Sequence, residues 1–134
     1  MSARGLRTLA GASMLAAVLG SVHAFSVFLE PLEAQFGASR AAVSLTYSGA
    51  LICLTIAVLF GHRIYARGPA AVIALMSGGL AAGGALVAAG AGTLPLVWLG
   101  YSGLFGAANG LGYGFGLQIA AQTNLLARNA TIEA

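Results

Sequence analysis

Three long stretches without a charged side chain decide what this chain can fold into. Aspartate, glutamate, lysine and arginine are absent from residues 8–29, 41–62 and 68–127, which are 22, 22 and 60 residues long. A helix needs about 20 apolar residues to cross the hydrocarbon core of a bilayer. The first two stretches therefore each predict one membrane span, and the third is long enough for two.

The third stretch is interrupted by the sequence GAGTLP at residues 90–95, where small residues and a proline favour a turn. We therefore expect an all-α membrane protein with four transmembrane helices near residues 9–29, 41–60, 70–91 and 95–119. Only 7% of the 134 residues are charged, whereas a soluble domain carries roughly 25%. Six arginines and three glutamates cannot cover the surface of a soluble globule of this size.

The arginines also predict how the spans are oriented. Arg4 and Arg7 precede the first span, Arg63 and Arg67 lie between the second and third, and Arg128 follows the fourth. The other two loops together hold two glutamates and one arginine. Because positive residues favour the cytoplasmic side, we expect a multi-pass protein of the plasma (inner) membrane with both termini in the cytoplasm.

The first span has an alternative interpretation as a secretory signal peptide. Its basic start is followed by an apolar run, with Val22 and Ala24 at the positions that a signal peptidase prefers. The apolar run continues through FSVFL to full spanning length, which favours a retained helix. The later spans are the same in both interpretations.

Six glycines crowd the sequence GLFGAANGLGYGFG at residues 103–116. A dinucleotide-binding loop needs the spacing G-x-G-x-x-G after a strand, and the alternating glycines at 110–116 never provide it. On a helix with 100° steps, Gly103, Gly110 and Gly114 share a face that we predict packs against another helix. The adjacent face is predicted to be polar and carries Ser102, Gly106, Asn109 and Tyr113.

Polar side chains inside the other spans point to a solute pathway. His23, Ser26 and Glu30 fall on one helical face of the first span, and the second span carries Ser44, Tyr47 and Ser48. Polar groups at membrane depth usually face a bundle interior or a water-filled path, although hydroxyls can also bond to carbonyls of their own helix. The residues predicted to line a substrate pathway are His23, Ser26, Tyr47, Asn109 and Tyr113.

The loop after the second span, GHRIYARGP, resembles the cytoplasmic motif of the major facilitator superfamily of transporters. Gly61 and Gly68 match its two glycines, while Tyr65 stands in place of its aspartate. The motif's basic residues are displaced to Arg63 and Arg67. The resemblance implies a cytoplasmic gating loop formed by Gly61, Arg63, Arg67, Gly68 and Pro69.

A second segment, FSVFLEPLEAQFGASRAAVSL at residues 25–45, resembles the end of helix 1 and the start of helix 2 in the monocarboxylate and oxalate/formate branches of that superfamily. It is carried by Phe28, Pro31, Leu32, Phe36, Gly37, Ser39, Arg40, Val43 and Ser44. Gly106 stands where a proton-coupling arginine is common in the superfamily. The resemblance implies the amino-terminal four helices of a twelve-helix transporter for small organic anions, mono- or dicarboxylates.

The expected partners are therefore the lipid bilayer, a small-molecule substrate with a proton or counter-anion, and the remaining part of the transporter. No cofactor, metal ion or nucleic acid is expected, because the chain has no metal-ligand cluster and its arginines are scattered. It is not expected to be an enzyme, since no nucleophile is paired with a base. Two alternatives are a four-span multidrug exporter, which would need an acid deeper than Glu30, and a non-transporting membrane scaffold.

Overall fold

The computed structural model describes residues 10, 11, 13, 14, 17, 18 and 20–132, and all regular structure in this part of the chain is helical. The elements are η1 (Ser21–Phe28), α2 (Leu29–Phe36), α3 (Arg40–Tyr65), α4 (Ala70–Ala89), α5 (Leu94–Val97), η2 (Trp98–Phe105) and α6 (Gly106–Ile132). Two of these segments are not α-helical. η1 is a 3-10 helix and η2 is a π-helix.

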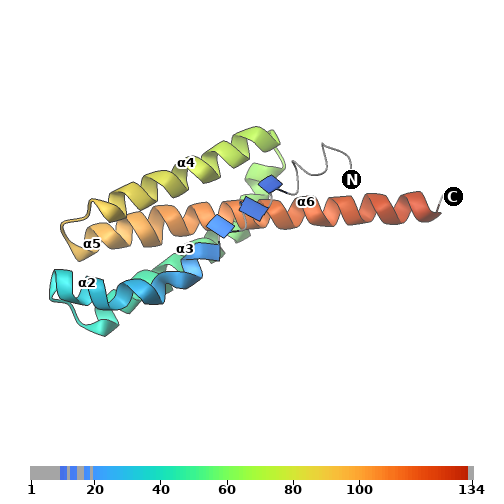
Figure 1. The fold of residues 1–134 in the computed structure, drawn as a ribbon. Helices are drawn as coiled ribbons and strands as arrows, with labels where there is room; N and C mark the ends of the chain where they lie inside the picture. The colour runs from blue at the N-terminus through green and yellow to red at the C-terminus, as the bar shows by residue number, and fades with distance from the viewer. Residues whose placement is uncertain (1–9, 12, 15–16, 19, 133–134) are drawn as a thin grey trace.

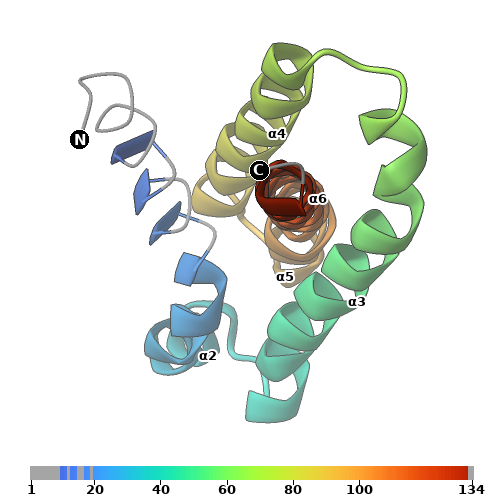
Figure 2. The same cartoon turned by 90° about the vertical axis from the view of Figure 1, so that its right-hand side faces the viewer.

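α5, η2 and α6 follow one another as a continuous rod that runs beside α3 and α4 and extends beyond them (Figure 1). Seen along its axis, the rod lies between α3 and α4, and the amino-terminal segment lies to one side (Figure 2). α6 and η2 both contact α3 and α4, whereas η1 and α2 contact α3. The core therefore consists of α3, α4 and the rod. The amino-terminal segment, formed by η1 and α2, packs against α3.

Local sequence explains where the helices begin and end. Gly37 ends α2 in a left-handed conformation, with φ of 58°, which a glycine adopts without strain. The Ser39 side chain then accepts a hydrogen bond from the backbone N–H of Ala42 and caps α3. Pro69 directly precedes α4, and Pro95 stands in the first turn of α5, where its missing N–H costs nothing.

The second and third predicted spans coincide with helices. α3 covers the range predicted at 41–60 and α4 covers most of that predicted at 70–91, and both are long and apolar enough to cross a membrane. The fourth predicted span, 95–119, is divided among α5, η2 and the first part of α6. The first, 9–29, falls partly outside the described residues, and its described part is helical.

Glycines bring α6 and α3 into backbone contact. A methyl group at Gly106 would lie 2.7 Å from the carbonyl oxygen of Ala50, and one at Gly110 would overlap the carbonyl of Leu54 and lie 2.7 Å from Cβ of Ala57. Such close approach gives many van der Waals contacts between the two helices. These two positions therefore accept no larger residue without moving a helix.

The rod meets α4 in the same way. A methyl group at Gly84 would lie 2.6 Å from the carbonyl oxygen of Gly100, and one at Gly100 would lie 2.6 Å from the amide nitrogen of Ala88. The two glycines thus face each other across the contact between α4 and η2. Close backbone contacts therefore hold the rod against α3 on one side and against α4 on the other.

Gly103 does not belong to this packing, contrary to the prediction from 100° steps. A methyl group there would meet only Trp98 and Leu99 of the same helical segment, at 3.9 and 4.0 Å. The residues that approach α3 are instead Ser102, Gly106 and Gly110, spaced four apart. Helices pack by such rows, and the π-helical hydrogen bonding before Gly106 changes the rotation per residue that an ideal α-helix would have.

Buried hydroxyl groups add hydrogen bonds between the same helices. Ser102 Oγ donates to the carbonyl of Thr46 at 2.7 Å, and Ser77 Oγ donates to the carbonyl of Ala108 at 2.9 Å. The acceptors are main-chain carbonyls of neighbouring helices, which close approach makes accessible. The core unit is therefore held by backbone contacts and by side chain to backbone bonds.

Candidate functional site

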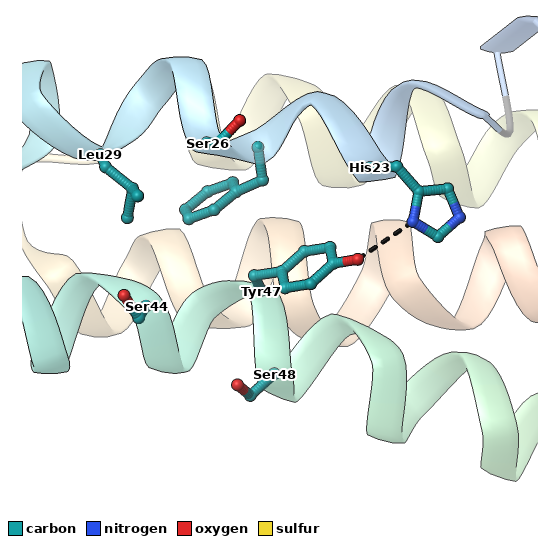
Figure 3. Close-up of a pocket in the computed structure, with 7 residues that line it drawn as sticks. His23, Ser26, Leu29, Ser44, Tyr47 and Ser48 are labelled. Atoms are coloured by element: carbon teal, nitrogen blue, oxygen red, sulfur yellow. Dashed lines mark hydrogen bonds between the residues drawn. The ribbon is translucent and has the colours of Figure 1, made fainter.

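A groove of about 240 Å³ lies between the amino-terminal segment and α3. It collects polar side chains from both sides of an otherwise apolar protein. Figure 3 shows η1 and the start of α2 along one side and α3 along the other. The groove is lined by His23, Phe25, Ser26, Leu29, Ser44, Tyr47 and Ser48.

The helix type of η1 aligns its groove residues. His23 and Ser26 of η1 are spaced three apart, Leu29 follows at the same spacing as the first residue of α2, and in a 3-10 helix side chains at this spacing eclipse each other. In an α-helix the same spacing would rotate each successive side chain by about 60°. Glu30, expected to share the face of His23 on an α-helix, is consequently not among the lining residues.

α3 provides its side of the groove by ordinary α-helical spacing. Ser44, Tyr47 and Ser48 stand at positions i, i+3 and i+4, which lie on one face. The predicted polar cluster of the second span is therefore a wall of the groove. Thr55, farther along α3, bonds to the carbonyl of Leu51 in its own helix at 2.8 Å instead.

One hydrogen bond crosses the groove. His23 Nδ1 lies 3.0 Å from the hydroxyl of Tyr47, and Figure 3 shows the two side chains reaching toward each other from opposite walls. A neutral imidazole protonated on Nε2 accepts this bond from the tyrosine. His23 is otherwise exposed, so the bond closes one end of the groove at its surface.

An aromatic cluster forms the inner side of the groove. Phe25 is only 3% exposed, and its ring lies nearly parallel to that of Tyr47, with 6.3 Å between centroids. The ring of Tyr101, on η2, lies 5.0 Å from that of Phe25, and the Tyr101 hydroxyl donates to the carbonyl of Val22 at 3.3 Å. Phe25 therefore joins η1 to both α3 and the rod.

No charged side chain is among the described residues that line the groove. Glu33 and Arg40 form an ion pair of 2.7 Å between α2 and the start of α3, away from the lining residues. The groove offers hydroxyl and imidazole groups beside apolar walls, which suits binding of a small polar molecule. Among the residues that the structure describes, no three His, Cys, Asp or Glu side chains come together as metal ligands.

Two predicted pathway residues lie elsewhere. Asn109 is 3% exposed within α6, and Tyr113 is 52% exposed; neither lines the groove. The prediction grouped them with the first two spans because all are polar residues inside spans. α6 instead packs with α3 and α4, and Ala50 and Leu54, which meet Gly106 and Gly110 of α6, lie further along α3 than the groove residues.

The loop that resembles the transporter motif is anchored by an aromatic residue. Tyr65, in the place of the motif's aspartate, donates from its hydroxyl to the carbonyl of Leu111 at 2.8 Å. Methyl groups at Gly61 and Gly114 would both collide with its phenol group. The side chain thus fills a slot between two glycines, and a neutral hydrogen bond ties the end of α3 to α6.

The remaining residues of this loop carry no inter-helix contact that the structure shows. Arg63 and Arg67 are exposed, and the Arg63 guanidinium lies 5.8 Å from the ring centroid of Phe60. The amide of Gly68 donates to the carbonyl of Ile64 at 3.0 Å, which closes the turn, and Pro69 then starts α4. Tyr65 was not assigned a role from the sequence. Its position four residues after Gly61, on the same helical face, could have indicated that the ring lies over that glycine.

Comparisons with known proteins return no match: no family model, no curated protein and no solved structure matches this chain. The interpretation of the groove therefore depends on its residues and their arrangement.

Proposed function

We propose that this chain crosses the plasma membrane four times, with both termini in the cytoplasm. α3 exposes a stripe of large apolar side chains, formed by Leu45, Ile52, Ile56 and Leu59, each at least half exposed. In α4, Leu75 and Leu86 are each 75% exposed. Only 17% of the most apolar window of either helix is buried, so these are unlike the core helices of a soluble protein, and lipid is the natural cover.

The positions of the charges support this topology. α3 begins at Arg40 and carries Arg63 in its last turn, which leaves a charge-free length of helix between them. The turn between α4 and α5 is uncharged. Because arginines favour the cytoplasmic side, the turn with Arg63 and Arg67 is assigned to the cytoplasm.

A pair of reporter fusions tests the four spans. A reporter that is active only in the cytoplasm should be active after Ala134 and inactive when inserted at Gly92, between α4 and α5. A reporter that is active only outside should show the reverse. External activity after Ala134 would contradict the four-span topology.

For the function, we propose secondary transport of a small solute, with this chain forming the amino-terminal part of a transporter of the major facilitator type. The single observation that carries this proposal is the groove, a line of hydroxyl and imidazole groups between η1 and α3, a helix whose middle exposes large apolar side chains. Polar residues at such depth are costly in lipid and are typical of a solute path. A scaffold would have no need of them.

The expected solute is a small organic anion, as the resemblance implies. A groove of about 240 Å³ is smaller than the roughly 300–1,000 Å³ of sites for drug-sized ligands. Its uncharged hydroxyl and imidazole groups can donate hydrogen bonds to a carboxylate, and the balancing cation would come from the other part of the transporter. The multidrug-exporter alternative receives no support, because Glu30 is not in the groove.

Solute protection and uptake test the transport proposal. With Cys53→Ser as background, a cysteine at Ser48 is modified by a membrane-impermeant maleimide, with and without formate, oxalate or lactate. We expect one of these anions to slow modification, and a cysteine at exposed Ser21 to be unaffected. The absence of protection by all three would overturn the anion proposal.

Uptake of the same labelled anions into proteoliposomes distinguishes a part from a complete transporter. Alternating access needs two bundles that move about a central site, so the purified 134-residue chain should show no uptake above empty vesicles. Saturable uptake, abolished by Ser48→Leu in the groove, would show that the chain transports on its own.

A further inference from the structure

We propose that η1 is a moving wall of the groove, and that the hydrogen bond between His23 and Tyr47 is the latch that holds it closed against α3. The proposed role of this movement is to admit a solute, and that role rests on the transport function proposed above. The movement itself follows from how η1 is attached and can be measured without any solute.

The attachment of η1 is slight. Of its eight residues, only Val22 and Phe25 are buried. Both belong to one patch: Val22 packs in the core with Ala50 of α3 and Phe105, and Phe25 contacts the rings of Tyr47 and Tyr101. This buried patch is the proposed pivot, and the exposed residues of η1 are the part that would turn about it.

The latch lies on the exposed side of that pivot. His23 follows Val22 directly but points across the groove to Tyr47 (Figure 3). The rings of His23 and Tyr47 meet edge to face, at 70° and 6.3 Å between centroids, so they share little contact area. The hydrogen bond is therefore the main attraction at this end of the groove, and breaking it releases the wall.

The helix type of η1 gives the wall a second conformation. 3-10 runs longer than three or four residues are uncommon because their hydrogen bonds are poorer than those of an α-helix, and η1 has eight residues. If η1 changed to an α-helix, His23, Ser26 and Leu29 would no longer be aligned along the groove. A change of helix type would thus withdraw His23 from Tyr47 and rearrange the wall in one step.

The partner of η1 across the pivot is also irregular. Tyr101 belongs to the π-helical η2, and π-helical segments are frequent at functional sites. Its ring also stacks on that of Phe105, with 5.2 Å between centroids, which continues the contact to the end of η2. The two non-α segments of the described chain therefore meet at the pivot, where each can adjust to the other.

A solute that hydrogen-bonds the Tyr47 hydroxyl would compete with His23 for the same group. Entry of a solute and release of the latch are then the same event. The opposite wall stays in place, because α3 is fixed to α6 at Gly106 and Gly110. The groove therefore opens by movement of η1 alone.

Cysteine modification in the absence of solute tests the latch. With Cys53→Ser as background, a cysteine replaces Ser44, a half-buried groove residue, and its rate of reaction with an impermeant maleimide is measured in nanodiscs. Tyr47→Phe should speed the reaction roughly twofold, the factor expected from the loss of one hydrogen bond at the surface. Tyr65→Phe is the matched control, since it removes a hydroxyl bond away from the groove, and should leave the rate unchanged.

A second probe separates opening from unfolding. A cysteine at Ser77, buried between α4 and α6, should stay unreactive in every variant that opens only the groove. If the Ser77 probe also reacts in Tyr47→Phe, His23→Ala and His23→Gln decide the outcome. Glutamine can still bond to Tyr47, so it should restore the slow rate that alanine loses.

Two results would overturn the proposal. One is an equal rate at the Ser44 probe with and without the Tyr47 hydroxyl. The other is a fast rate in His23→Gln equal to that in His23→Ala, which would mean that the hydrogen bond is irrelevant. Neither result bears on solute protection, so the latch and the transport proposal can fail separately.

Discussion

α3 has two neighbours that it holds in opposite ways. Toward α6 it presents Ala50 and Leu54, whose carbonyls lie against Gly106 and Gly110, and this contact is backbone against backbone. Toward η1 it presents Tyr47, whose ring contacts Phe25 and whose hydroxyl reaches His23. At Gly106 and Gly110 the first interface has no side chain that could rotate away, whereas the contacts of Tyr47 with η1 are made by side chains only.

The difference teaches how a helical bundle can be rigid at one contact and adjustable at another. Glycine gives close van der Waals packing at the contact with α6. The contact of His23 with Tyr47 is a single exposed hydrogen bond, which is weaker and can be replaced by water or a solute. The same helix thereby serves as a fixed support and as one wall of the groove.

The largest expected effect breaks the fixed side. Gly110→Ala should lower the free energy of unfolding by about 3 kcal/mol, because its methyl group would overlap the carbonyl of Leu54. Gly116→Ala in the same helix has no described atom within 4 Å and should raise stability by about 0.5–1 kcal/mol. Thermal unfolding in detergent, followed by circular dichroism, measures both; equal shifts would remove the packing argument.

A slightly smaller effect is expected where the rod meets α4. Gly84→Ala places a methyl group 2.6 Å from the carbonyl of Gly100 and should cost about 2 kcal/mol. The cost is lower than at Gly110 because η2 is π-helical and can shift its hydrogen bonds. Gly79→Ala, on a part of α4 with open space, is the control, and destabilisation by that variant would contradict the prediction.

The Tyr65 slot gives an intermediate case. Tyr65→Phe removes the hydrogen bond to Leu111 and should cost about 1 kcal/mol. Gly114→Ala pushes on the same hydroxyl, which lies 2.7 Å from the added methyl group. Because both changes act on one contact, the double variant should cost less than the sum of the two. If the two losses in the free energy of unfolding were additive in the same thermal assay, Tyr65 and Gly114 would not act through one contact.

The smallest effect on stability is expected at the latch. Tyr47→Phe should change the free energy of unfolding by less than about 0.5 kcal/mol, since the lost bond is at the surface. It should nevertheless give the largest change in groove accessibility of any of these variants. Destabilisation as large as that of Gly84→Ala would mean that η1 is part of the fixed core.

Sequence reasoning located the elements whose limits depend on charge and proline. The bounds of α3 and α4 follow from the charge-free stretches and from Pro69, and the polar residues of the second span do share a face. The 3-10 and π-helical segments could not be foreseen, because η1 and η2 contact each other through Phe25 and Tyr101, which are far apart in the sequence. Their altered rotation per residue explains why Gly103 and Glu30 were placed on the wrong faces.

The hydrogen-bond partners of the polar side chains could not be predicted from the sequence either. Hydroxyl groups were expected either to face a pathway or to bond within their own helix, and Thr55 does the latter. Ser77 and Ser102 instead reach carbonyls of neighbouring helices, which depends on the packing of small residues around them. Asn109 was expected in the pathway because it is polar. It is instead buried within α6 and does not line the groove.

Distance measurements between spin labels test most directly whether α3 has one fixed and one moving neighbour. In the Cys53→Ser background, one label pair at Val27 and Leu45 spans η1 and α3, and another at Ile52 and Leu117 spans α3 and α6; all four positions are exposed. In nanodiscs we expect a broader distance distribution for the first pair, broadened further by Tyr47→Phe, and a narrow, unchanged one for the second. Distributions of equal width that do not respond to Tyr47→Phe would contradict the account.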